Sequence, residues 1–156
     1  MRRSIHCVSS GAFWVMPADK RVGVPFRMFL TDAPLRLWAP TEDGDRIVIH
    51  FVARQRLEVY RDRELAEFRC RTREYSYTVS DADLHETVRW HWHPDTHPAP
   101  HVHVAGFRGH IPSGRVTFES VVRFLIEEMK ADPSDERWDE VLTTEEGRHR
   151  EFRTWH

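Results

Sequence analysis

His85–His110 reads HETVRWHWHPDTHPAPHVHVAGFRGH and holds seven of the eleven histidines of the chain. Each half of this stretch alternates between apolar and polar residues, and side chains of a β-strand point to opposite faces with a period of two residues. If the two halves pair as neighbouring strands, Trp90 and Trp92 share one face with Val102 and Val104. The other face then carries Arg89, His91, His93, His101 and His103. The stretch therefore predicts a sheet with one apolar face and one face crowded with imidazoles.

The residues around this stretch predict further strands. Arg46–Val59 is rich in apolar and β-branched residues and predicts one strand or a pair of strands. Tyr75–Val79 and Thr87–His93 lie on either side of an acidic turn, so they predict a hairpin. Pro94–Pro100 predicts a loop of seven residues, and the next strand is expected at His101–Ala105.

Helical periodicity follows the strands. Phe118–Lys130 carries one broad apolar stripe at helical spacing, and Thr117 is a suitable N-cap residue. Pro133 predicts the start of a second short helix, because proline is favoured in the first helical turn. Trp138, Val141 and Leu142 are expected to face inward from this second helix.

Together these elements predict a single α+β domain, in which a C-terminal helix packs on the apolar face of a small antiparallel sheet of hairpins. Residues 1–44 have weak periodicity and are expected to form a poorly defined lead-in. Residues 45–142 form the predicted core of the domain, and residues 143–156 are expected to be a polar tail.

Composition and charge narrow the class of protein. The formal net charge is −2, so the chain is no polycation of the kind that binds nucleic acid through charge alone. Cys7 and Cys70 are far apart and form no zinc-finger or redox motif. No run of about 20 apolar residues predicts a membrane span, and a cytoplasmic protein is expected.

One hypothesis for the imidazole face is metal binding. In a strand, the two histidines of a His-x-His motif lie about 7 Å apart on one face, and a neighbouring strand can supply a third ligand. Zinc accepts three imidazoles and keeps an open position for water. In this interpretation the cofactor is zinc or another divalent metal, and the candidate ligands are His91, His93, His101 and His103.

A second hypothesis is catalysis by proton transfer, with no cofactor. Histidines can take a proton from one oxygen and give one to another, as in the cleavage of RNA at its own 2′-hydroxyl. His93, His101 and His103 are the candidate acid and base groups, and Arg89 would stabilise the phosphate charge.

The preceding strand supplies candidate substrate-binding residues for this second hypothesis. Arg71 and Arg73 could contact phosphate, while Tyr75 and Tyr77 could stack on bases or simply pack. All four have the same odd parity in the strand, unless a bulge intervenes. A third hypothesis is that the histidines have no function beyond occupying an exposed sheet face.

Short motifs within residues 73–129 occur in an order that is similar to a known family. They are Tyr75-Ser76-Tyr77, the turn at Asp81–Asp83, Arg89-Trp90, His93-Pro94, Pro100-His101-Val102-His103-Val104 and the amphipathic helix. This order resembles the TumE-like toxins of bacterial toxin–antitoxin pairs. The chain departs from the family pattern at His91, where the family has aspartate. It also has Trp92-His93-Pro94-Asp95 where the family has Asn-Ala-Pro-His-His.

The resemblance implies a small cytoplasmic toxin that acts on RNA and is neutralised by a cognate antitoxin, usually a helix-turn-helix protein. Matched residue by residue, it implies functional roles for Tyr75, Tyr77, Arg89, His93, His101 and His103. The favoured expectation is therefore a toxin with ribonuclease activity. The alternative is a non-catalytic module whose histidine-rich face binds a metal or a protein partner.

Overall fold

The computed structural model describes residues 1–12, 14–30 and 33–154 of the chain. The described helices are α1 (Arg2–His6), α2 (Phe118–Glu127) and α3 (Trp138–Phe152). The described strands are β1 (Trp14–Val15), β2 (Phe26–Leu30), β3 (Leu35–Pro40), β4 (Arg46–Arg61), β5 (Phe68–Ser80), β6 (Glu86–His93), β7 (His97–Val104), β8 (Ile111–Pro112) and β9 (Arg153–Thr154).

These strands form a single sheet around the long strand β4. The order of the strands is β1-β2-β4-β5-β6-β7-β8, while β3 also pairs with β4 and β9 with β5. β5 runs along one edge of β4, and β3 and β2 share its other edge. All pairings are antiparallel except that of β5 with β9. The expected antiparallel sheet is confirmed. It is larger than predicted, because all the described strands join in one sheet.

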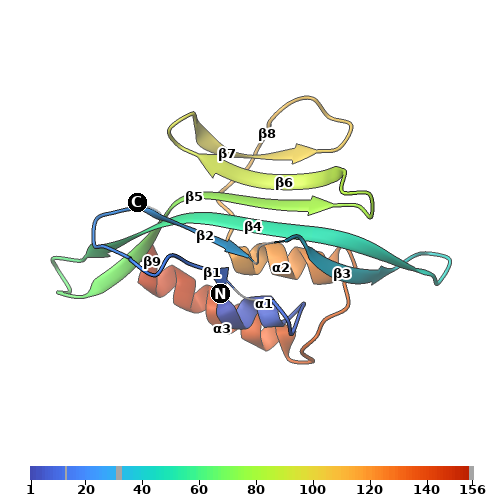
Figure 1. Ribbon diagram of the computed structural model, residues 1–156, viewed down its shortest axis with the longest axis horizontal. Coiled ribbons are helices and arrows are strands. Elements are labelled where there is room, and N and C mark those ends of the chain that lie inside the picture. Colours follow the sequence, from blue (N-terminus) through green and yellow to red (C-terminus); the bar gives the residue numbers. More distant parts are fainter. Residues whose placement is uncertain (13, 31–32, 155–156) are drawn as a thin grey trace.

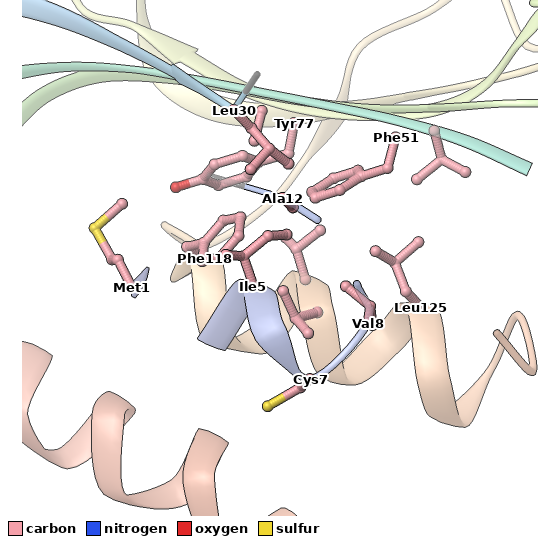
Figure 2. Close-up of a cluster of buried hydrophobic side chains, with 14 of the residues drawn as sticks. Met1, Ile5, Cys7, Val8, Ala12, Leu30, Phe51, Tyr77, Phe118 and Leu125 are labelled. Atoms are coloured by element: carbon pink, nitrogen blue, oxygen red, sulfur yellow. The ribbon is translucent and has the colours of Figure 1, made fainter. Parts of the chain in front are cut away.

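The helices α1, α2 and α3 lie together on one side of the β4 ribbon, while β6, β7 and β8 extend away at the top of the view (Figure 1). The core lies between the sheet and these helices. Figure 2 shows Phe51 and Tyr77 projecting from the sheet toward Phe118 of α2, with Ile5 of α1 beside them. All four side chains are 0–1% exposed. The molecule is therefore α+β, with the sheet as its larger part and helices on one face.

The predicted strands agree with this sheet in position. Arg46–Val59 lies within β4, and the hairpin of β5 and β6 pairs Tyr77 with Trp90. The predicted loop over Pro94–Pro100 is wrong in its second half, because β7 already begins at His97 and pairs with His93. The ladder is irregular at this point, and prolines are tolerated at such irregularities.

A β-bulge in β5 decides which side chains reach which face of the sheet. Arg56 pairs with Glu74 and Leu57 pairs with Thr72, so Arg73 is an extra residue between them. A bulge reverses the alternation of the strand beyond it. Tyr75 therefore faces the helices, whereas Arg71, which has the same odd parity but precedes the bulge, lies on the opposite face beside Glu58.

The segments at the two ends of the chain are more ordered than the sequence predicts. Residues 1–44 contain α1, β1, β2 and β3. The prediction of a polar tail from residue 143 is wrong over residues 143–152, because α3 continues there. Its last turns bury His149 and contain the ion pair of Glu146 with Arg150 one helical turn apart, which stabilises a helix.

The helix after the sheet is confirmed and ends earlier than predicted. α2 begins after Thr117, whose side-chain oxygen accepts a hydrogen bond from the backbone N–H of Ser120 at 3.0 Å. It ends at Glu127, and Lys130 then adopts a left-handed φ of 57° that a helix does not accommodate. Among the described residues, no helix is long and apolar enough to cross a membrane.

Thr117→Ala is expected to lower the free energy of unfolding by about 1 kcal/mol, because it removes the side-chain cap of α2. Thermal or urea unfolding followed by circular dichroism measures this change. Thr144→Ala is the matched control, since Thr144 is exposed in α3 and alanine is the better helix former there. Equal destabilisation by the two substitutions would show that the cap does not hold α2.

Candidate histidine and arginine site

The histidines of β6 and β7 lie on the face of the sheet opposite the helices. His91 pairs directly with His101, and Arg89 pairs with His103. Trp92 of β6 is 5% exposed on the helix-covered face, as the alternation of the sequence predicts. The structure therefore confirms that Arg89, His91, His93, His101 and His103 share the uncovered face.

The imidazole rings on this face are in contact. The ring centre of His91 lies 4.0 Å from that of His101, 4.7 Å from that of His103 and 5.0 Å from that of His93. His110, from the connection between β7 and β8, stacks on His101 at 4.3 Å. We call His91, His101 and His103 the imidazole cluster.

The ring nitrogens of the imidazole cluster are available to a metal ion. One ring nitrogen from each of the three residues lies within 4.8 Å of the others. The Nε2 atom of each is buried and has no hydrogen-bond partner among the described residues. The N–H at Nδ1 of His101 donates to the carbonyl oxygen of Ala99 at 3.0 Å, if the proton is on that nitrogen. This tautomer leaves Nε2 with a free lone pair, as a metal ligand requires.

A second group of three histidines overlaps the first. It contains His97, His101 and His110, and its ring nitrogens also lie within 4.8 Å of one another. His101 belongs to both groups. Because only Nε2 of His101 is left to bind an ion, a metal ion can occupy one of the two groups but not both at once.

Burial favours the uncharged form of two imidazoles of the cluster, those of His91 and His103. It is the main reason that the pKa of His91 is lowered to about 3, and the neighbouring His101 and Arg89 add to the shift. Burial also lowers the pKa of His103, followed by the effect of Arg89. At neutral pH these two imidazoles are therefore neutral and can act as bases or metal ligands, but not as proton donors.

His93 differs from the cluster because it has a carboxylate partner. Its Nδ1 lies 2.8 Å from a side-chain oxygen of Glu74, which faces it from β5. The side chains of His93 and Glu74 are 33% and 26% exposed, so a substrate can reach them. A carboxylate that holds one ring nitrogen orients the imidazole and leaves the other nitrogen free for proton transfer.

Beside this pair lies a depression of about 630 Å³ that we call the arginine depression. Its lining includes Glu74 and His93 together with four arginines: Arg27, Arg54, Arg56 and Arg89. Arg27 and Arg54 make no ion pair within the part of the chain that the structure describes. Arg56 contacts Glu74 and Asp95, and Arg89 contacts Glu86. The guanidiniums of Arg27 and Arg54 therefore carry the argument for an anionic ligand, and arginine is suited to phosphate.

The predicted substrate-binding arginines lie elsewhere. Arg71 and Arg73 both contact the carboxylate of Glu58 at 2.8 Å. The hydrogen bond from Arg71 is the main reason that the pKa of Glu58 is lowered. Arg73 also lines a smaller depression of about 300 Å³, which shares Arg56 with the larger one. Both arginines are thus engaged by Glu58 within the protein, and Arg73 also borders the smaller depression.

The predicted base-stacking tyrosines lie in the core. Tyr75 and Tyr77 are 1% and 0% exposed, on the helix-covered face. The hydroxyl of Tyr75 accepts a hydrogen bond from the backbone N–H of Val116 at 3.2 Å. Of the two uses that the sequence left open for these residues, the structure matches packing.

Several residues of the site were not singled out in the sequence. Glu74 follows from the register of the β5–β6 hairpin, because Tyr75 pairs with Trp92 and Ser76 with His91, but the sequence alone did not give this register. Arg27, Arg54 and Arg56 come from β2 and β4, far from the histidines in sequence. One signal in the sequence pointed to Arg54 and Arg56, which is that arginines are frequent from residue 54 onward.

Comparison with family models, curated proteins and solved structures gives no match to this chain. The likeness to TumE-like toxins therefore stays a prediction from short motifs. The geometry of the uncovered face is what bears on the function of the chain.

The neutral imidazole of His91 predicts loss of stability in acid. The pKa of His91 in the folded chain lies below its ordinary value of 6.5, so the unfolded chain binds a proton first as the pH falls. The stability is present above about pH 6.5 and is lost as the pH falls toward 3. Urea unfolding of the chain in chelator at pH 7, 6 and 5 is expected to show this decline.

His91→Gln should reduce this pH dependence of the free energy of unfolding. The reduction should correspond to up to about one proton fewer taken up on unfolding. His85→Gln is the matched control, because the side chain of His85 is 80% exposed. An unchanged slope in His91→Gln would contradict the assignment of a buried neutral imidazole at this position.

Proposed function

We propose that the chain cleaves RNA on the uncovered face of its sheet, as the toxin component of a toxin–antitoxin pair. The observation that carries the proposal is the contact of His93 with Glu74 at the wall of the arginine depression. An oriented imidazole beside a group of guanidiniums is suited to proton transfer at a phosphodiester.

In this proposal the arginine depression holds the phosphate. Arg54 and Arg89 bind its non-bridging oxygens and stabilise the charge that develops on them in the transition state. Nε2 of His93 takes the proton of the 2′-hydroxyl, whose oxygen attacks phosphorus. The 5′-oxygen leaves and takes a proton from water, and the hydroxide that remains takes the proton from His93, which returns to its neutral form. The products are a 2′,3′-cyclic phosphate and a 5′-hydroxyl end, and no external oxidant or energy source is needed.

The first test is cleavage of one oligoribonucleotide and of the DNA oligonucleotide with the same sequence by untagged protein. We expect cleavage of RNA alone, because DNA lacks the 2′-hydroxyl that His93 deprotonates. His93→Ala should lower the rate by about 100-fold or more, the ordinary contribution of an acid–base group. Arg54→Ala should also lower it, through weaker phosphate binding.

Arg150→Ala is the control for the arginine substitution. Arg150 lies on α3, and its side chain is 76% exposed. Its loss changes the net charge of the protein as much as the loss of Arg54 and leaves the depression intact. Equal losses in Arg54→Ala and Arg150→Ala would point to unspecific charge effects. Equal cleavage of DNA and RNA would exclude attack by the 2′-hydroxyl.

The cellular role gives a separate prediction. Induced expression of the chain in bacteria is expected to arrest growth, and His93→Ala should relieve the arrest at equal protein level. A cognate antitoxin, expected to be a helix-turn-helix protein, should restore growth of cells that express the unaltered chain. Normal growth of cells that express folded, unaltered chain would count against the toxin role, though not against RNA cleavage.

A non-catalytic metal-binding module is the second candidate. The observation that favours it is the burial of the three Nε2 atoms of the imidazole cluster. In that case the arginine depression would bind an anionic partner without cleaving it. Binding of RNA with no cleavage, when zinc and folded protein are both present, would favour this second function.

A further inference from the structure

We propose that His91, His101 and His103 bind one divalent transition-metal ion of the zinc type through their Nε2 atoms. The three residues come from two paired strands and hold their ring nitrogens within 4.8 Å of one another. Imidazole nitrogens bind zinc at about 2.0–2.1 Å in a tetrahedral arrangement. Small rotations of the side chains bring the three nitrogens to those distances, because all three rings already lie on the same face.

The hydrogen bonding of the cluster favours a metal ion over a purely structural role. Nε2 of His91, His101 and His103 is buried without a partner among the residues described. Buried polar atoms without a partner cost free energy, and proteins seldom leave three of them together. The bond of Nδ1 of His101 to Ala99 also matches the way in which metal-binding histidines are oriented by a backbone carbonyl.

The alternative group of His97, His101 and His110 fits a metal ion less well. Nδ1 of His101 is held by Ala99, so His101 has one nitrogen left and cannot serve two ions. His110 is exposed and lies on the connection between β7 and β8, whereas His91 and His103 are anchored in paired strands. A rigid strand positions a ligand more tightly than a connection does. We therefore expect one ion per chain, at the imidazole cluster.

His93 is not in the ligand set, because its ring nitrogens are not among those that lie within 4.8 Å of one another in the imidazole cluster. The carboxylate of Glu86 is directed to Arg89 at 3.4 Å, so no carboxylate of the described residues completes the site. Three neutral ligands leave the ion with its full double positive charge and an open position. That position takes water or an anion, and the phosphate held in the neighbouring arginine depression is the anion at hand. This last role depends on the proposed function, whereas binding of the ion does not.

The test uses untagged full-length protein, stripped with a chelator and then titrated with Zn²⁺ alone. We expect one tightly bound equivalent by calorimetry and by elemental analysis after dialysis. Co²⁺ in place of Zn²⁺ should give the intense visible absorption of a tetrahedral site. The double variant His91→Ala/His103→Ala should bind Zn²⁺ more than about 100-fold more weakly. Residues that only orient a ligand usually cost less than this when they are changed.

The matched control is His97→Ala/His110→Ala, which removes the same number of imidazoles from the same face. It should retain one equivalent of Zn²⁺ and the tetrahedral Co²⁺ spectrum. Metal binding that is lost in this control and kept in His91→Ala/His103→Ala would overturn the inference. So would the absence of a stoichiometric site in the unaltered protein. Circular dichroism of each variant establishes that it is folded before the titration is interpreted.

The metal site and the proposed cleavage of RNA can fail separately. One equivalent of bound Zn²⁺ without cleavage supports the site and removes the catalytic function. Undiminished cleavage by stripped protein that binds no Zn²⁺ supports the catalytic function and overturns the site. Cleavage that is lost on stripping and restored by Zn²⁺ supports both.

Discussion

The three helices pack on the same face of the sheet, and this one-sided packing constrains every long strand. Apolar side chains are needed on the helix-covered face alone, so the other face is free to carry polar groups. Phe51, Tyr77 and Trp92 meet this requirement from β4, β5 and β6. Because a strand alternates, the residues beside them are committed to the uncovered face. The histidines and arginines gather there for this reason.

The bulge at Arg73 is the local device that makes β5 fit this arrangement. Without the extra residue, the arginines before Arg73 would share a face with Tyr75, and either the charges or the rings would lie in the core. The shift of one residue places Glu58 and Arg71 together on the uncovered face and leaves Tyr75 under the helices. The register of β5 against β6 then places Glu74 opposite His93. The bulge thus keeps both the tyrosines in the core and the arginines out of it.

The imidazole cluster is not explained by stability. Its rings are crowded, and its Nε2 atoms lack partners within the described chain. The lowered pKa values of His91 and His103 mean that protonation in acid opposes folding. The arginine depression likewise gathers like charges. Unpartnered imidazole nitrogens and clustered guanidinium charges lie side by side on one face. Such groups are expected where ligands complete them, a metal ion for the imidazoles and an anion for the guanidiniums.

The sequence by itself determined the alternation of β6 and β7, the pairing of the two halves of the histidine-rich stretch, and the start of α2 at its Thr117 cap. These features are local, because a period of two residues and a capping side chain are visible within a few positions. Only the tertiary structure decided that Glu74 meets His93, that Arg27 and Arg54 border the same depression, and that Tyr75 is buried. These contacts depend on strand order and on one bulge, which join residues far apart in the chain.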